Sequence, residues 1–200
     1  PPPAPIPPPA RLGWAVVTPE LVVFALVRIV GSLPVLRWPL AGGLLAIAVD
    51  FADLFVRDIL GAAAIGDYQA VDKWLDQLYL AAFLVVALRW PDPERAVAVA
   101  LYGLRLLGFA LFEASGDRFV LVLFPNVFEV WFLFVVLLRR RTSPGDALAW
   151  SRRRLVVALA ACTGLKLGHE VALHGLRLFD GYTTFTALEA IGRALFGPGR

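Results

Sequence analysis

Residues 94–114 of the chain read ERAVAVALYGLRLLGFALFEA. The stretch is long enough to cross a bilayer, because the hydrocarbon core needs about 20 predominantly apolar residues in a helix. It contains four charged residues: Glu94 and Arg95 at its start, Arg105 near its middle and Glu113 near its end. We therefore predict a transmembrane helix over these residues.

The composition of the whole chain extends this prediction. Of 200 residues, 59% are hydrophobic and 18% are charged, with a mean hydropathy of +0.72. An ordinary soluble domain carries about 25% charged residues. We therefore predict an all-α, multi-pass membrane helix bundle with about six transmembrane helices. The single cysteine, Cys162, excludes an internal disulfide framework and a zinc or iron–sulfur site built from cysteines.

Six apolar segments are long enough to cross or nearly cross a bilayer. They are residues 19–36, 40–60, 71–90, 94–114, 118–138 and 153–178. Around them we predict a proline-rich extended tail at 1–17, a six-helix transmembrane domain at 18–180, and an interfacial amphipathic helix (183–196) with its tail within 181–200. Pro125 lies inside the fifth segment, so we expect a kink there and a freed carbonyl at Leu121.

Basic residues are unevenly distributed over the predicted loops. The loops after the first, third and fifth spans hold nine of them, namely Arg37, Arg89, Arg95, Arg139, Arg140, Arg141, Arg152, Arg153 and Arg154. Because short loops rich in arginine stay in the cytoplasm, we predict that this side is cytoplasmic and that both termini are outside. This pattern argues against nucleic acid as a partner. Binding of lipid phosphates is an alternative role for the same arginines.

Charged residues also occur near the middle of the predicted spans. They are Arg28, Asp50, Asp53, Arg105, Glu129, Lys166 and Glu170, with His169 beside the last two. Each charge at the centre of a membrane helix costs about 2.5 to 3.5 kcal/mol, and the whole set costs on the order of 20 kcal/mol if it faces lipid. We therefore expect these residues to face the interior, where acids and bases neutralise one another.

Helical spacing places the charges on shared faces. Asp50 and Asp53 share one face of the second span, and Asp76 and Tyr79 share one face of the third. In the predicted directions these faces run toward the outer side, which predicts a polar cavity that opens outward. The candidate binding or relay residues are Asp50, Asp53, Arg105, Glu129, Lys166, His169 and Glu170. A network that only fixes helix registry is the alternative.

The aspartates of the second and third spans have the spacing of a known signature. Asp50-x-x-Asp53 is followed by Asp72-x-x-x-Asp76. This pattern resembles the CDP-alcohol phosphotransferases, six-span enzymes whose signature reads D-x-x-D-G-x-x-A-R and then G-x-x-x-D-x-x-x-D. The resemblance implies that the four aspartates hold a divalent cation such as Mg²⁺, that the metal binds the diphosphate of a CDP-lipid, and that Asp76 is the base toward the incoming hydroxyl.

The chain departs from that signature outside the aspartates. Leu54, Arg57, Asp58 and Tyr68 stand where the signature has glycine, alanine, arginine and glycine. The resemblance is therefore partial: either the chain is a degenerate relative that keeps the scaffold, or the aspartate spacing is a coincidence.

Three classes of function follow. The first is binding or translocation of a cation or proton in the buried cavity. The second is a structural or accessory subunit, as a homo-oligomer or in a larger membrane complex. The third is a metal-dependent lipid phosphotransferase-like enzyme. All three place the chain in the lipid bilayer, as a multi-pass protein of the plasma (inner) membrane.

Overall fold

Six α-helices make up most of the part of the chain that the computed structural model describes, which comprises residues 19–59, 68–117, 123–142 and 150–170 and positions 120, 148 and 197. The elements are α1 (Pro19–Ser32), η1 (Leu33–Leu36), α2 (Pro39–Ile59), α3 (Tyr68–Ala87), α4 (Glu94–Ser115), α6 (Val127–Arg139) and α7 (Arg152–Glu170). These residues contain no strand, so the all-α prediction is confirmed for them. The predicted tail at 1–17 and the predicted interfacial helix at 183–196 lie outside the described residues.

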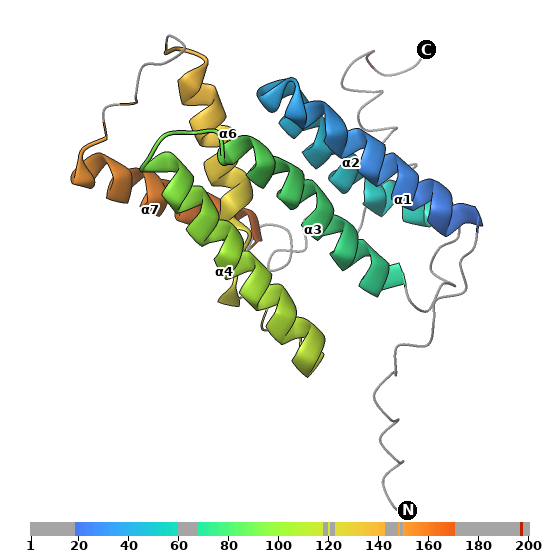
Figure 1. The fold of residues 1–200 in the computed structure, drawn as a ribbon. Helices are drawn as coiled ribbons and strands as arrows, with labels where there is room; N and C mark the ends of the chain where they lie inside the picture. Colours follow the sequence, from blue (N-terminus) through green and yellow to red (C-terminus); the bar gives the residue numbers. More distant parts are fainter. Residues whose placement is uncertain are drawn as a thin grey trace, which may run out of the picture.

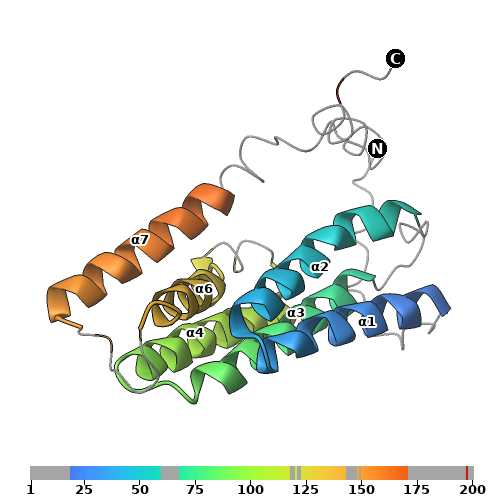
Figure 2. The ribbon, with the colours of Figure 1, turned by 90° about the horizontal axis from the view of Figure 1, so that it is seen from above.

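The helices pack in two layers. In one layer α3 lies between α1 and α4, and in the other α6 lies between α2 and α7 (Figure 2). The layers are joined by contacts of α1 with α2 and of α6 with both α3 and α4. Figure 1 shows α3 beside α4 on one side and the α1–α2 pair on the other. Helices α3 and α6 are therefore the central elements of the bundle.

Local sequence explains several helix boundaries. Helix α1 begins with Pro19, whose fixed φ suits the first helical position. Helix α4 begins directly after Pro93 and ends at Gly116, which adopts a left-handed φ of 68° and donates its N–H to the carbonyl of Phe112 at 2.7 Å. The first four predicted segments each coincide with a helix, apart from a few residues at their ends.

The fifth predicted segment, at 118–138, is wrong as a single kinked helix. Helix α6 starts only at Val127, after Asn126 with φ −75° and ψ 65°, and Pro125 is not helical. Proline removes a backbone donor and clashes with the preceding turn, so here it ends the helical path and does not merely bend it. Leu121, whose carbonyl was expected to be freed, lies outside the described residues.

The core lies between α3 and α6 and is largely aromatic. Phe83 of α3 stacks on Phe132 of α6 with ring centroids 4.2 Å apart, and Trp90 stacks on Phe132 at 5.5 Å. Phe128 and Trp131 of α6 are also fully buried. Burial of each large apolar side chain contributes about 1.5–3 kcal/mol, so this contact stabilises the centre of the bundle.

Large apolar side chains also cover the outside of the bundle. Val30 of α1 and Leu165 of α7 are 61% and 67% exposed, and Leu107 of α4 is 51% exposed. Among the described helices, α4 alone is long and apolar enough to cross a membrane, while residues 21–36 and 39–50 form shorter apolar helices. The described residues therefore form a helical bundle in which one helix, α4, is both long and apolar enough to cross a membrane.

Candidate functional site

Arg28 joins three helices through two carboxylates. Its side chain is buried on α1, and its Nη2 atom contacts Oδ1 of Asp50 on α2 and lies 2.6 Å from Oδ1 of Asp76 on α3. Lys73, one turn earlier on α3, places its Nζ 3.6 Å from Oδ2 of Asp76. The guanidinium also lies over the ring of Phe24, 5.7 Å from its centroid. These contacts neutralise charge inside the bundle, as the sequence predicted for Arg28 and Asp50.

A second group of polar side chains begins one turn further along α3. The Tyr79 hydroxyl donates to Oε2 of Glu129 at 3.0 Å. The Nδ2 of Asn126 donates to the same oxygen at 2.8 Å and to the Tyr79 hydroxyl at 3.2 Å. Asn126 is held at the start of α6 because Pro125 prevents the helix from beginning earlier. The three side chains therefore connect α3 to α6 around one carboxylate.

These two groups form one buried charge cluster. Its members are Arg28, Asp50, Lys73, Asp76, Tyr79, Asn126 and Glu129. Oδ1 of Asp50 and Oδ1 of Asp76 both contact the same atom, Nη2 of Arg28. The cluster is therefore built around two acids from different helices that share one guanidinium.

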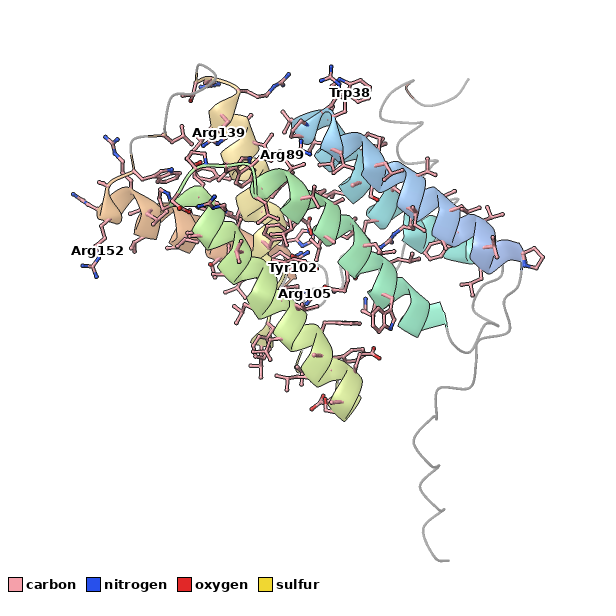
Figure 3. The ribbon with its side chains drawn as sticks, in the orientation of Figure 1. Trp38, Arg89, Tyr102, Arg105, Arg139 and Arg152 are labelled. Atoms are coloured by element: carbon pink, nitrogen blue, oxygen red, sulfur yellow. The ribbon has the colours of Figure 1, made fainter. Side chains whose placement is uncertain are left out.

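Several predicted site residues lie outside these contacts. Arg105 of α4 donates from Nη1 to the carbonyl of Phe124 at 3.1 Å and forms no ion pair with any described residue. Lys166 is buried and His169 is half-buried on α7, which packs mainly against α6. Figure 3 shows Arg105 and Tyr102 on the same helix, away from the end where Arg139 lies.

The four aspartates of the predicted metal site are described only in part. Asp50 and Asp76 come together on Arg28, whereas the side chains of Asp53 and Asp72 lie outside the described residues, as does that of Glu170. The described residues hold no group of three or more histidine, cysteine, aspartate or glutamate side chains able to bind a metal ion. At the described pair, the guanidinium of Arg28 lies where the two carboxylates converge.

Sequence reasoning missed a second buried carboxylate. Glu94, at the first position of α4, is 1% exposed, and its Oε2 accepts from Nη2 of Arg139 and, at 3.1 Å, from Nε of Arg139. Its Oε1 accepts from Nε1 of Trp150 at 2.7 Å. The sequence places Glu94 at a helix start and Arg139 in a basic loop, but gives no signal that pairs residues so far apart.

Comparison with known proteins adds no family: the chain matches no protein-family model, no curated protein and no solved structure. The function is therefore argued from the buried charge cluster and from the surface that surrounds it.

Proposed function

We propose that the chain is a multi-pass membrane protein of about six spans, placed in the plasma (inner) membrane. The proposal is supported by a distribution of polarity opposite to that of a water-soluble protein. Charged side chains meet inside the bundle, while large apolar side chains lie on its surface. Exposed apolar surface on this scale is disfavoured in water and suits lipid.

Helix lengths are compatible with this proposal. At 1.5 Å per residue, α2 with its 21 residues and α4 with its 22 residues are each about 30 Å long, which equals the hydrocarbon thickness of a bilayer. Helix α2 carries four charged residues and α3 carries three, and those whose side chains are described, Asp50, Lys73 and Asp76, lie together in the cluster. Helix α1 with its 14 residues would need η1 to complete its crossing.

A labelling experiment tests the topology. In a chain with Cys162→Ala and Asp67→Cys, an impermeant thiol reagent applied to intact cells should label the new cysteine, because the segment between α2 and α3 is proposed to be outside. Labelling only after permeabilisation would invert the proposed orientation. Recovery of the chain in the soluble fraction would contradict the membrane proposal itself.

Within this bundle we propose that the buried charge cluster binds or transfers a proton or a small cation. The observation that carries the proposal is the contact of one guanidinium, that of Arg28, with two carboxylates from different helices. The described members of the cluster include three acids, Asp50, Asp76 and Glu129, and two bases, Arg28 and Lys73, which leaves one negative charge in excess. Ionisable groups inside a membrane bundle mark ion and proton pathways.

A relay through the cluster has a physical route. Asp76 and Tyr79 are one turn apart on α3, and the Tyr79 hydroxyl reaches Glu129 at 3.0 Å. A hydroxyl both donates and accepts, so that of Tyr79 can exchange a proton with Glu129. Asp50 and Asp76 are 31% and 16% exposed at their side chains, so neither carboxyl group is fully closed off from the surroundings of the bundle.

The full chain in proteoliposomes tests this function. With a pH-sensitive dye inside the vesicles and an imposed membrane potential, we expect proton entry that Asp76→Asn abolishes. Asp92→Asn is the matched control, because it removes an exposed acid (58%) in the turn between α3 and α4. Equal proton entry with Asp76→Asn and the unaltered chain would refute transfer through the cluster.

A structural role is the second candidate, and one observation favours it. Every acid among the described cluster residues is already held by a basic or hydrogen-bonding partner, as a registry network requires. In that case a charge-neutral paired replacement such as Arg28→Gln with Asp76→Asn should leave the function intact, and the chain should purify with other subunits. A monodisperse chain that transfers protons would contradict this role.

The lipid phosphotransferase-like reading stays a prediction from aspartate spacing. It requires Mg²⁺- or Mn²⁺-dependent turnover of a CDP-lipid by membranes enriched in the chain. Absence of metal-dependent turnover would remove it.

A further inference from the structure

A pocket of about 360 Å³ opens at the end of the bundle opposite the start of α1. We call it the basic pocket, and it is lined by Arg37, Trp38, Pro39, Leu40, Ala41, Trp90, Val136, Arg139 and Arg140. These residues come from the turn between η1 and α2, from the end of α3 and from the end of α6. Figure 3 shows Trp38, Arg89 and Arg139 at this same end of the molecule.

The basic pocket carries a surplus of positive charge. Arg139 is partly neutralised, because its Nε and Nη2 atoms bind the buried carboxylate of Glu94. Arg37 and Arg140 are exposed, and neither forms an ion pair with any described residue. Two guanidinium groups are therefore available to an anion, and guanidinium binds phosphate oxygens through paired hydrogen bonds.

Backbone groups in the same pocket also favour an anion. Helix α2 begins at Pro39. The hydrogen bond that closes its first turn is donated by the N–H of Gly42 to the carbonyl of Trp38, at 2.7 Å. The amides of Leu40 and Ala41 precede that bond, so they have no acceptor within the helix. The positive end of the helix dipole adds to the field of the arginines.

The remaining lining is apolar and aromatic. Trp90 and Val136 are buried, whereas Trp38 is 61% exposed beside the pocket. A tryptophan in this position is typical of the boundary between lipid tails and headgroups. The pocket thus places guanidinium groups next to apolar surface, an arrangement that fits a phosphate attached to acyl chains better than a phosphate alone.

We propose that the basic pocket binds the phosphate group of an anionic phospholipid. The lipid source rests on the proposed membrane location, whereas the phosphate chemistry rests on the arginines and the helix start alone. The site is separate from the buried charge cluster, so a lipid bound here acts as a structural or regulatory ligand and not as the transported ion. Basic pockets between membrane helices on the cytoplasmic side are suited to such headgroups.

The test is isothermal titration calorimetry, in which each probe is added to the purified full chain in uncharged detergent. The probes are short-chain phosphatidylglycerol, short-chain phosphatidylcholine and inorganic phosphate. We expect saturable binding of phosphatidylglycerol, and about tenfold weaker binding for each arginine lost in Arg37→Gln with Arg140→Gln. The matched control is Arg89→Gln with Arg152→Gln, which removes the same charge at exposed positions outside the pocket.

The outcomes test both the binding site and the kind of phosphate ligand. Equal weakening by both double variants would overturn the site, because it would show attraction to net charge only. Binding of inorganic phosphate as tight as that of phosphatidylglycerol would overturn the lipid assignment. Ala41→Glu is a second variant, at an exposed position of the lining, and its added carboxylate should also abolish binding. None of these changes touches the charge cluster, so proton entry should persist in all of them if the proposed function holds.

Discussion

The ion pair between Glu94 and Arg139 gives a prediction about which partner is costlier to remove. Glu94 is 1% exposed at its side chain and Arg139 is 24% exposed. In Arg139→Met the carboxylate left behind has no access to water. In Glu94→Gln the guanidinium left behind reaches water, and the amide oxygen still accepts from Trp150. We therefore expect Arg139→Met to be the more destabilising change.

The magnitudes follow from this difference in exposure. Removal of one partner of a buried ion pair costs about 3–5 kcal/mol, so Arg139→Met should lower the free energy of unfolding by about that amount. For Glu94→Gln the loss should be about 1–2 kcal/mol, the cost of a hydrogen bond to a charged group that water can partly replace. The double variant should be more stable than Arg139→Met alone, because no unpaired charge stays buried.

Denaturant titration of the purified full chain in detergent micelles, followed by tryptophan fluorescence, measures these differences. Asp92→Asn is the control: it breaks an ion pair with Arg95 whose side chains are 58% and 46% exposed, and should cost less than about 1 kcal/mol. The reasoning is refuted if Arg139→Met is no more destabilising than Glu94→Gln, or if the exposed pair costs as much as the buried one.

Four further substitutions test the packing and the charge cluster, each measured by the same titration. Gly42→Ala should lower the free energy of unfolding by about 1–3 kcal/mol, because the added Cβ would clash with the backbone of Val35 in η1. Gly103→Ala, with nothing within 4 Å, should raise it by about 0.5–1 kcal/mol. Phe132→Ala should lower it by about 3–5 kcal/mol, because the ring is fully buried in the aromatic core. Tyr79→Phe should lower it by about 1–3 kcal/mol, because Glu129 loses a donor at 3.0 Å while packing is kept.

Each of these predictions has a contrary result. Equal tolerance of alanine at Gly42 and Gly103 would contradict the close approach of η1 to α2. A small effect of Phe132→Ala would place the core elsewhere. If Tyr79→Phe is neutral, the hydroxyl is not a required partner of Glu129.

The helical segments were largely predictable from the sequence, because their signal is local. Apolar runs of sufficient length mark the helices, and proline or glycine marks their ends, as at Pro19, Pro93 and Gly116. The failure at Pro125 has the same origin, since a proline inside an apolar run predicts either a kink or a break. The structure shows a break, with Asn126 placed to bind Glu129.

The site was predictable only in outline. The cost of a charge in an apolar segment indicates that Arg28, Asp50 and Glu129 face inward, and helical spacing adds Asp76 and Tyr79. The pairing of these residues was not readable, because ion pairs across helices depend on which helices are neighbours.

The sequence by itself determined the composition, the helical segments and the side of the bundle that is rich in arginine, because each depends on residues close together in the chain. Only the tertiary structure decided that Arg28 meets Asp50 and Asp76, and that Glu94 is buried against Arg139. It also decided that Arg37 and Arg140 line one pocket. These contacts depend on which helices are neighbours, here α1 on α2 and α3, and α4 on α6.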